Sequence, residues 1–273
     1  MSGITPNILA AWREYVGRQS VDRQHLELES LRRYAVAVDA NIDVERELPP
    51  LAHWAFFLPT TVDEGMGEDG HARRGAFLPP ITLARRMFAA ATIDFLAPLL
   101  IAEKAELSTT IKNVAHKVGA SGDLIFVEVE RHVRQRGVVR IREDQHYVYR
   151  ETGAPVPMPQ PLTCRPAGEL WQPDAVNLFR FSAATFNAHR IHYDAAYAVC
   201  VEQYPALVIH GPFAAAKLAA LAQRDGPLAR FTFRANAPLF LGQPVSLQKR
   251  GEEVLAVRCD GVTAMTAQSR FQQ

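Results

Sequence analysis

The sequence predicts an α+β fold made of two similar units in one chain. Two stretches alternate apolar and polar residues as half-buried antiparallel strands do, and each follows a segment with helical periodicity. A proline-rich stretch separates them. With 273 residues, of which 48% are apolar, the chain is long enough for two domains of ordinary size with a full hydrophobic core.

The first unit is expected over residues 1–150. Its meander consists of strands predicted at 106–118, 123–135 and 137–150. Ahead of the meander, the segment SLRRYAVAV places four apolar residues on one face of a predicted helix. These residues are Leu31, Tyr34, Ala35 and Val38.

Residues 151–175 differ from both flanks because six prolines fall within them. Proline fixes φ and has no N–H to donate, so neither a helix nor a central strand is expected to run through this stretch. We interpret it as a linker between the two units.

The second unit is expected over residues 176–273 and repeats the layout of the first. Its helix is predicted at 211–226, where Phe213, Leu218 and Leu221 indicate a mostly buried element that ends at Gly226. Short turns join the strands that follow. These strands are predicted at 229–237, 244–250, 253–259 and 262–271.

Composition excludes several classes of partner. The net charge of +1 argues against nucleic-acid binding, and no apolar run approaches the roughly 20 residues that a membrane-spanning helix needs. The first residues lack the pattern of a signal peptide, so a cytoplasmic protein is expected. The three cysteines are widely spaced without a CxxC pair, which predicts small buried side chains and no disulfide framework or zinc site.

Polar side chains concentrate in the segment FSAATFNAHRIHYD (181–194). Histidine suits proton transfer because its pKa lies near neutrality, whereas an asparagine amide orients water but cannot act as a general base. On these residues alone two interpretations stay open: proton-transfer chemistry, and the commoner case of a solvated helix start with Asp194 as a first-turn acid. The polar residues are Ser182, Thr185, Asn187, His189, Arg190, His192, Tyr193 and Asp194.

The segment FNAHRIHYD resembles the signature of the MaoC-like, or R-specific, hydratase/dehydratase superfamily, which runs D-x-N-P-x-H. Asn187 stands at the position of the aspartate and His192 at that of the histidine, while His189 and Arg190 replace the asparagine and the proline. This variant resembles a subgroup that contains type 2 hydroxyacyl-thioester dehydratases and the mesaconyl-C4-CoA and itaconyl-CoA hydratases. Further segments that resemble the subgroup are 53–59, 67–87 and 149–151.

The resemblance implies a double hotdog fold, in which each unit wraps an antiparallel sheet around a long helix and one site forms between the units. It implies that His192 is the general acid–base that handles the proton of water. Asn187 replaces a carboxylate and is expected to hold the water by its amide. His189 is a second titratable candidate, and Asp194 is expected to orient a ring nitrogen.

Gly211, in the segment VIHGP (208–212), is the position at which the resemblance implies a backbone N–H donor to the thioester oxygen. A helix start presents free N–H groups and a partial positive charge, and glycine permits a close approach. Without the resemblance, an ordinary glycine–proline helix start is the preferred interpretation.

Arginines near these segments are the expected binding groups for coenzyme A phosphates or a substrate carboxylate. The alternative for the glycine-rich loop 67–80 is a solvated surface loop. Structural roles are expected for His116 and His132, and an aromatic packing position next to Trp54 is expected for His53. The predicted substrate-binding residues are Arg73, Arg74, Arg190 and His189, with Arg85 and Arg86 as further candidates.

The function that the resemblance implies is a hydro-lyase that hydrates a short dicarboxylic enoyl-CoA, itaconyl-CoA or mesaconyl-C4-CoA, to citramalyl-CoA. Rivals are a 3-hydroxyacyl-thioester dehydratase of fatty-acid synthesis, a non-catalytic acyl-thioester-binding protein and a thioesterase. No metal or redox cofactor is expected because water addition is redox-neutral, and coenzyme A enters as part of the substrate. A homodimer is expected from the family.

Overall fold

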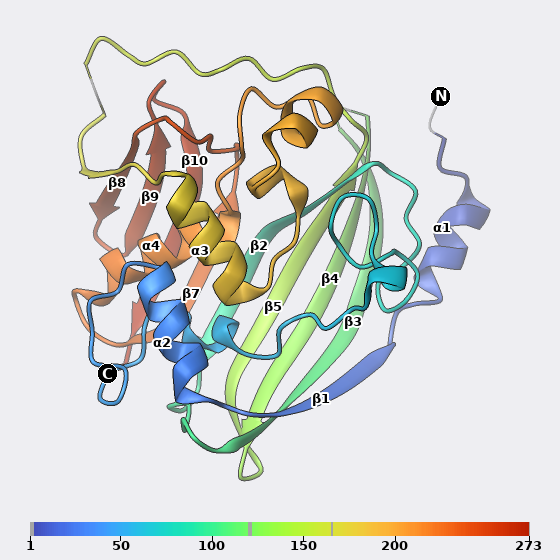
Figure 1. Ribbon diagram of the computed structural model, residues 1–273. Helices are drawn as coiled ribbons and strands as arrows, with labels where there is room; N and C mark the ends of the chain where they lie inside the picture. The colour runs from blue at the N-terminus through green and yellow to red at the C-terminus, as the bar shows by residue number, and fades with distance from the viewer. Residues whose placement is uncertain (1–2, 120–121, 165, 273) are drawn as a thin grey trace.

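The structure is a computed structural model that describes residues 3–119, 122–164 and 166–272 (Figure 1). Within these residues, ten strands form one sheet in the order β1-β3-β4-β5-β2-β7-β10-β9-β8-β6, and every neighbouring pair is antiparallel. The predicted α+β class is therefore confirmed. The strands are β1 (Gln19–His25), β2 (Arg85–Phe95), β3 (Lys104–Gly119), β4 (Gly122–Gln135), β5 (Val138–Arg150), β6 (Glu169–Trp171), β7 (Leu228–Ala235), β8 (Val245–Arg250), β9 (Glu253–Arg258) and β10 (Thr263–Phe271).

Helices are fewer than strands. The α-helices are α1 (Pro6–Arg13), α2 (Leu28–Ala37), α3 (Ala175–Thr185) and α4 (Gly211–Gln223). Short helical turns are η1 (Ala52–Ala55), η2 (Asp63–Gly65), η3 (Arg190–His192) and the π-helical η4 (Tyr197–Val201). No helix of the described residues has the length and apolar character needed to cross a membrane.

The two units share the sheet through β2 and β7, which are neighbours in the strand order. The pairing runs from Ala90 opposite Arg234 to Asp94 opposite Arg230, and the last two side chains form an ion pair. Both meanders therefore lie in one continuous layer (Figure 1).

Helix α4 covers the strands of the second unit. It packs against β7, β8, β9 and β10, and the predicted core residues Phe213, Leu218 and Leu221 are all buried. The helix ends at Gln223, and Gly226 follows with a φ of 146° in the turn before β7. The predicted position of this helix is confirmed.

Helix α2 carries the apolar face predicted for it, since Leu31, Tyr34, Ala35 and Val38 are buried. It lies against α3 and η1, and the ring centroids of Tyr34 and Phe181 are 6.4 Å apart. One core cluster therefore contains residues of both units.

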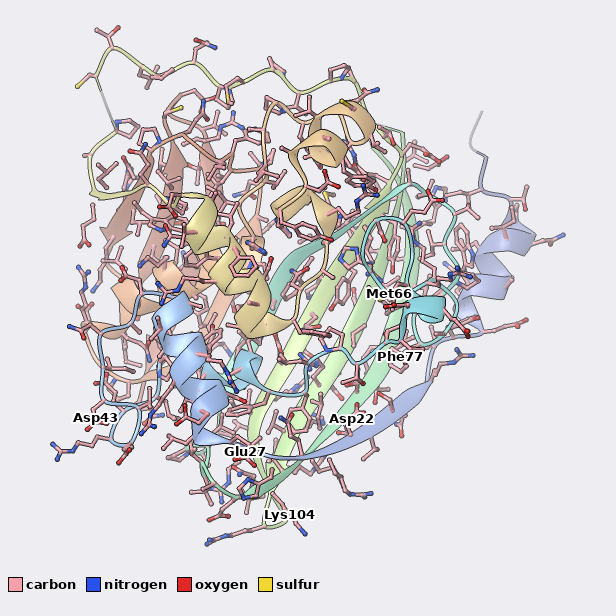
Figure 2. All side chains as sticks on the ribbon, viewed as in Figure 1. Asp22, Glu27, Asp43, Met66, Phe77 and Lys104 are labelled. Carbon is pink, nitrogen blue, oxygen red and sulfur yellow. The ribbon has the colours of Figure 1, made fainter. Side chains whose placement is uncertain are left out.

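A loop covers the meander of the first unit. Ile81 packs with Ile111 and Val127 of β3 and β4, and Phe77 lies against the same cluster. Figure 2 shows Met66 and Phe77 on this loop, in front of the strands. The loop thereby brings residues 66–81 over the face of the sheet on which the second unit's segment 186–194 lies (Figure 1).

The predicted strands of both meanders are confirmed to within a few residues, whereas β1 and β2 were not predicted. The segment QSVDRQH of β1 is largely exposed because it is an edge strand, held by backbone pairing with β3. The segment RRMFAAATIDF of β2 has no strict alternation of apolar and polar residues, because residues 87–91 are all apolar.

The proline-rich stretch 151–175 contains the short strand β6, which pairs with β8 and ends the strand order. An edge position is compatible with prolines nearby. The interpretation of this stretch as a linker stays a prediction. The expectation of buried cysteines was wrong for Cys164 and Cys200, which are exposed, while Cys259 is buried.

A buried carboxylate joins η1 to the first meander. Glu143 is 1% exposed and accepts a hydrogen bond from the Trp54 indole at 3.0 Å. His53 and Arg131 lie 3.4 and 3.3 Å from the carboxylate, and Gln145 donates to it at 2.9 Å. The His53 ring also packs against Trp54, with ring centroids 5.6 Å apart, which confirms the aromatic packing position expected for it. Burial alone would raise the pKa of Glu143, but its histidine and arginine partners lower it to about 2.

We expect the stability of the protein to fall in acid because of Glu143. Its pKa drops from 4.5 to about 2 on folding, so this contribution is fully present above pH 4.5 and is lost as the pH falls toward 2. A shift of this size corresponds to about 3 kcal/mol. Urea unfolding between pH 6 and 3 measures it. Glu143→Gln should weaken the dependence, and an unchanged slope in this variant would contradict the assignment.

Candidate active site

His192 lies in η3 with its ring fixed by a backbone carbonyl. Its Nδ1 donates a hydrogen bond to the Val208 carbonyl oxygen at 2.7 Å, because that oxygen can only accept. The lone pair therefore resides on Nε2, the atom that can take a proton. Burial lowers the pKa of His192 to about 4, against the hydrogen bond to Val208, which raises it. His192 is thus a neutral imidazole at physiological pH, as a general base must be.

Four histidine rings form a continuous row through the site. The ring centroids of His192 and His210 are 3.7 Å apart and nearly parallel, and those of His189 and His192 are 5.4 Å apart and perpendicular. His71, from the first unit, lies 4.0 Å from His189. Ser182 contacts the Nε2 atom of His210 at 2.8 Å. Burial holds the pKa of His210 well below its ordinary value. The two stacked rings, His192 and His210, are therefore both neutral at physiological pH.

The first unit reaches the site through the loop 66–73. The backbone N–H of Arg190 donates to the Asp69 carbonyl at 2.9 Å, and the Arg190 guanidinium donates to the Glu68 carbonyl at 3.1 Å. Gly70 has a φ of 84°, and a Cβ there would stand 1.8 Å from the Ala188 carbonyl oxygen. Glycine at this position therefore allows the loop to lie directly on the segment that carries His189.

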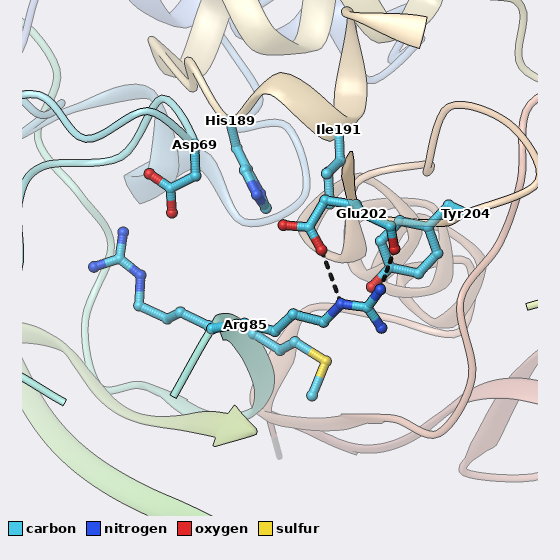
Figure 3. Close-up of a pocket in the computed structure, with 9 residues that line it drawn as sticks. Asp69, Arg85, His189, Ile191, Glu202 and Tyr204 are labelled. Atoms are coloured by element: carbon cyan, nitrogen blue, oxygen red, sulfur yellow. Dashed lines mark hydrogen bonds and ion pairs between the residues drawn. The ribbon is translucent and has the colours of Figure 1, made fainter. Parts of the chain in front are cut away.

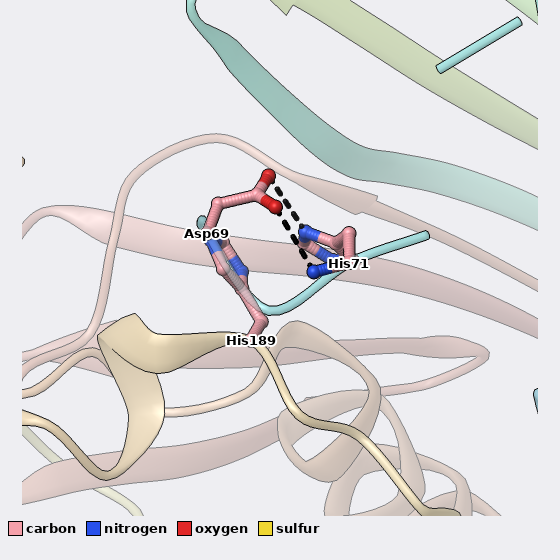
Figure 4. A group of neighbouring side chains, drawn as sticks. All are labelled: Asp69, His71 and His189. Atoms are coloured by element: carbon pink, nitrogen blue, oxygen red, sulfur yellow. Dashed lines mark hydrogen bonds and ion pairs between the residues drawn. The ribbon is translucent and has the colours of Figure 1, made fainter. Parts of the chain in front are cut away.

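Asp69 and His71 form a hydrogen-bonded pair on this loop (Figure 4). The Asp69 carboxylate accepts from the backbone N–H of His71 at 2.9 Å and from its Nδ1 at 3.1 Å. Burial raises the pKa of Asp69, but the bonds from His71 outweigh burial and hold it well below its ordinary value. Burial lowers the pKa of His71 against the bond from Asp69. The pair is an ionised carboxylate held by a neutral imidazole.

His189 completes a group with this pair. One ligand-type atom from each of Asp69, His71 and His189 lies within 4.8 Å of the others, a spacing compatible with a metal ion. The Nδ1 of His71 lies 3.1 Å from the Asp69 carboxylate, so this nitrogen and one carboxylate oxygen are already engaged in a hydrogen bond. The geometry favours a hydrogen-bonded pair. Burial lowers the pKa of His189 to about 2, and repulsion from His71 and His192 in their protonated forms acts in the same direction.

A pocket opens beside this group, lined by residues of both units (Figure 3). Asp69, Arg86 and His189 are among them, and the cavity of about 30 Å³ is large enough for ordered water. Arg85 binds Glu202 at 2.8 Å with 3% of its side chain exposed. Arg86 makes no ion pair in the part of the chain that the structure describes, so it is the pocket cation available to an anionic ligand.

Asn187 and Gly211 each lie close in sequence to histidines of the row, Asn187 to His189 and Gly211 to His210. The Asn187 side-chain oxygen accepts from the backbone N–H of His189 at 3.0 Å, which forms a local turn. Gly211 is the first residue of α4 and directly follows His210, whose ring stacks on His192. The first N–H groups of a helix have no partner within it. Water binding by Asn187 and oxyanion binding by Gly211 stay predictions.

The predicted binding arginines differ in how they are engaged. Arg74 donates to the carbonyls of Ile81, Leu83 and Ala84, which orders the loop. Arg190 pairs with Asp194 at 2.7 Å, so Asp194 orients this arginine. Arg73 is exposed and contacts the Met66 carbonyl at 3.1 Å. Direct binding of substrate by these arginines stays a prediction.

Asp69 and His71 were not predicted as site residues. A signal was present, because both lie in the segment GEDGHARRG, which shares the resemblance of the His192 motif. The substrate-binding role was instead predicted for their sequence neighbours Arg73 and Arg74, since arginine is the common partner of phosphate and carboxylate. The approach to His189 depends on a contact across more than a hundred residues of chain, which no local pattern encodes.

Comparisons with known proteins agree with the family resemblance of the sequence. The family model for hydroxyacyl-thioester dehydratase type 2 matches residues 51–241. Mesaconyl-C(4)-CoA hydratase of Chloroflexus aurantiacus is 41% identical over 275 residues, which cover 94% of this chain and 97% of the relative. The mitochondrial hydroxyacyl-thioester dehydratase type 2 of Schizosaccharomyces pombe is 27% identical over 245 residues, covering 78% of this chain and 80% of the relative.

Solved structures show the same fold. HtdX of Mycobacterium tuberculosis matches with a TM-score of 0.69 at 16% identity, over 93% of this chain and 100% of the other. A MaoC-like dehydratase of Phytophthora capsici matches at 0.65 with 14% identity, over 97% and 98%. Another M. tuberculosis protein, described as a double hotdog, matches at 0.52 with 11% identity, over 93% and 95%. The predicted double hotdog is confirmed.

Proposed function

Because the chain belongs to the hydroxyacyl-thioester dehydratase type 2 family, we propose that it hydrates a short dicarboxylic enoyl-CoA, with mesaconyl-C4-CoA as substrate and citramalyl-CoA as product. The predicted membership of the MaoC-like superfamily is confirmed by the same findings. The chain is accordingly an enzyme of the hydro-lyase class.

The observation that carries the proposal is the state of His192. Its Nδ1 proton is held by Val208, its Nε2 is a neutral base, and the start of α4 lies beside it. In the proposed reaction, Nε2 takes a proton from water while the water oxygen bonds to the β-carbon. The π electrons of the double bond move to the thioester, whose oxygen accepts the Gly211 N–H. His192 then returns a proton to the α-carbon.

The balance of this reaction requires no redox cofactor. One O–H bond and one π bond break, one C–O bond and one C–H bond form, and no electrons are gained or lost. We therefore propose that the enzyme uses no cofactor besides the coenzyme A of its substrate.

Arg86 supports a substrate with a second carboxylate. In mesaconyl-C4-CoA the free carboxylate is attached to the carbon that receives the hydroxyl group, so it must lie close to the reacting water. Arg86 lines the pocket beside Asp69 and His189 without an acidic partner among the described residues. A guanidinium binds a carboxylate through two parallel hydrogen bonds. We propose that Arg86 binds this carboxylate, and that Arg73 binds coenzyme A phosphates.

Finer assignments also belong to the proposal. Itaconyl-CoA carries the same pair of thioester and carboxylate and is proposed as a second substrate, with a role in itaconate degradation. A cytoplasmic homodimer is proposed from the family. The mass of 30.3 kDa per chain makes dimerisation simple to test by light scattering.

Loss of the enoyl-thioester absorbance tests the function. Mesaconyl-C4-CoA, crotonyl-CoA and a long-chain enoyl-CoA are supplied side by side, and we expect the highest kcat/KM for mesaconyl-C4-CoA. Preference for the long-chain substrate would favour the fatty-acid dehydratase. Release of free thiol without hydration would favour a thioesterase, and inactivity on all three substrates would contradict the enzymatic proposal.

A further inference from the structure

We propose that Asp69, held by His71, is the carboxylate of the active site that binds the reacting water, in place of the carboxylate that the second unit lacks at Asn187. This inference rests on the proposed hydration reaction and deepens it. Asp69 acts on the water directly, and His71 is a positioning residue that acts through Asp69.

The position of Asp69 is the first support. It lines the pocket together with His189 and Arg86, and its carboxylate lies within 4.8 Å of a ring nitrogen of His189. The His189 ring in turn contacts His192 edge-on at 5.4 Å. Asp69 and His192 are therefore both neighbours of the His189 ring, and the reacting water is proposed to bind where it can reach both side chains.

The local backbone holds Asp69 in this position. The backbone N–H of Gly67 donates to the His71 carbonyl at 2.7 Å and that of Gly70 to the Gly67 carbonyl at 3.0 Å, which closes a tight turn around the residue. The Asp69 carbonyl binds the N–H of Arg190 across the junction of the two units. A side chain fixed on both sides in this way loses little further freedom when it binds water.

The bonds from His71 decide which task Asp69 can perform. Both occupy carboxylate oxygens at 2.9 and 3.1 Å, and each oxygen retains a second lone pair. A carboxylate whose pKa is far below its ordinary value is a weak base. It remains an acceptor of hydrogen bonds at every physiological pH. Asp69 is therefore suited to orient a water hydrogen, while His192 removes the other.

The reaction is balanced with these assignments. The water donates one hydrogen bond to Asp69 and its second proton to Nε2 of His192, and its oxygen forms the bond to the β-carbon. Asp69 undergoes no change of protonation. The proton on His192 returns to the α-carbon.

The charges around Asp69 come from several elements. In the proposed complex, Arg86 of β2 pairs with the substrate carboxylate, so this carboxylate and that of Asp69 are not two unpaired negative charges in one pocket. The titratable and charged groups around Asp69 are His71 and Arg74 from its own loop, Arg86 from β2, His189 from the segment after α3, and Tyr197 from η4. The ion pair of Arg85 with Glu202 lines the same pocket.

Asp69→Asn tests the role of the carboxylate in the full-length enzyme with mesaconyl-C4-CoA. We expect kcat to fall about 10- to 100-fold with little change in KM, because an amide that replaces a charged acceptor binds the water more weakly but leaves the thioester contacts intact. Glu68→Gln is the matched control, since Glu68 contacts Arg190 through its backbone carbonyl. It should retain wild-type kcat. Thermal unfolding of each variant separates loss of chemistry from loss of fold.

His71→Gln tests the positioning role through the pH profile. Without the ring, the pKa of Asp69 rises, since burial is then opposed by the backbone N–H bond of residue 71 but no longer by the imidazole. Asp69 then takes up a proton at a higher pH, so the acid limb of kcat should move upward relative to wild type. The double variant Asp69→Asn, His71→Gln has no carboxylate to protonate and should lose this shift. A purely structural role predicts no such dependence.

Several outcomes would overturn the inference. Wild-type hydration together with normal kcat in folded Asp69→Asn would reject it while leaving the proposed function intact. A stoichiometric metal ion in the purified protein that disappears in Asp69→Asn would show a metal ligand instead. Inactivity of the wild type on every enoyl-CoA would reject the hydratase function and this inference with it.

Discussion

Replacing His192 with asparagine should lower kcat for hydration of mesaconyl-C4-CoA by about 10²- to 10⁴-fold, the usual contribution of a general acid–base. Asparagine is chosen because its amide N–H₂ can still donate to the Val208 carbonyl, the bond that holds the imidazole in the wild type. The variant therefore removes Nε2, while the buried Val208 carbonyl keeps a hydrogen-bond donor. Steady-state kinetics with thermal unfolding measures both effects.

The control for this variant is His25→Gln, because His25 is exposed on the edge strand β1 and pairs with the exposed Glu27. It should hydrate at the wild-type rate. A folded His192→Asn enzyme with near-normal kcat would exclude His192 as the base.

The pH profile gives a further check on His192. A base must be unprotonated, and the pKa of His192 is lowered by burial to about 4. The wild-type kcat/KM should therefore stay level as the pH falls from 7 to about 5 and decline only near pH 4. A decline centred near the ordinary histidine value of about 6.5 would mean that a solvated histidine controls the reaction.

Replacing Arg86 with glutamine should reduce kcat/KM for mesaconyl-C4-CoA by about 10²- to 10³-fold. Removing one partner of a buried charged pair costs roughly 2–5 kcal/mol, because the remaining charge is left desolvated and unpaired. In this enzyme the unpaired charge would be the substrate carboxylate beside the pocket residues Asp69 and Glu202. Arg86→Lys should recover part of the loss, since it restores charge without the paired hydrogen bonds.

The substrate supplies the control for Arg86. Crotonyl-CoA has the thioester and the double bond but lacks the second carboxylate, so its low rate should be nearly unchanged by Arg86→Gln. The ratio of the two kcat/KM values is the diagnostic quantity. Equal losses of kcat/KM on both substrates would show that Arg86 stabilises the structure of the pocket and does not bind the carboxylate.

Much of the fold follows from local patterns. The meander strands predicted at 123–135 and 253–259 were confirmed almost residue for residue as β4 and β9, because alternating side chains on a half-buried sheet leave a period of two in the sequence. The strands β1 and β2 were not predicted. The first is a largely exposed edge strand, and the second contains the unbroken apolar run 87–91, so neither shows the period of two in its sequence.

Local sequence patterns do not decide which of the two arginines at the start of β2 is available to bind a ligand. Arg85 and Arg86 are adjacent and chemically identical, and the sequence offers both as binding residues. Neighbouring residues on a strand point to opposite faces. Arg85 is thereby buried on Glu202, which lies more than a hundred residues further along the chain, while Arg86 is left without an acidic partner among the described residues.

The sequence by itself determined the α+β class, the faces of α2 and α4, and the candidate base, because strand alternation, helical periodicity and the His192 motif are properties of consecutive residues. Only the tertiary structure decided which groups surround that base. The pairing of β2 with β7 and the close packing of Gly70 against the Ala188 carbonyl bring Asp69 and His71 against His189. Contacts between segments so far apart depend on the packing of the whole sheet, which local sequence does not specify.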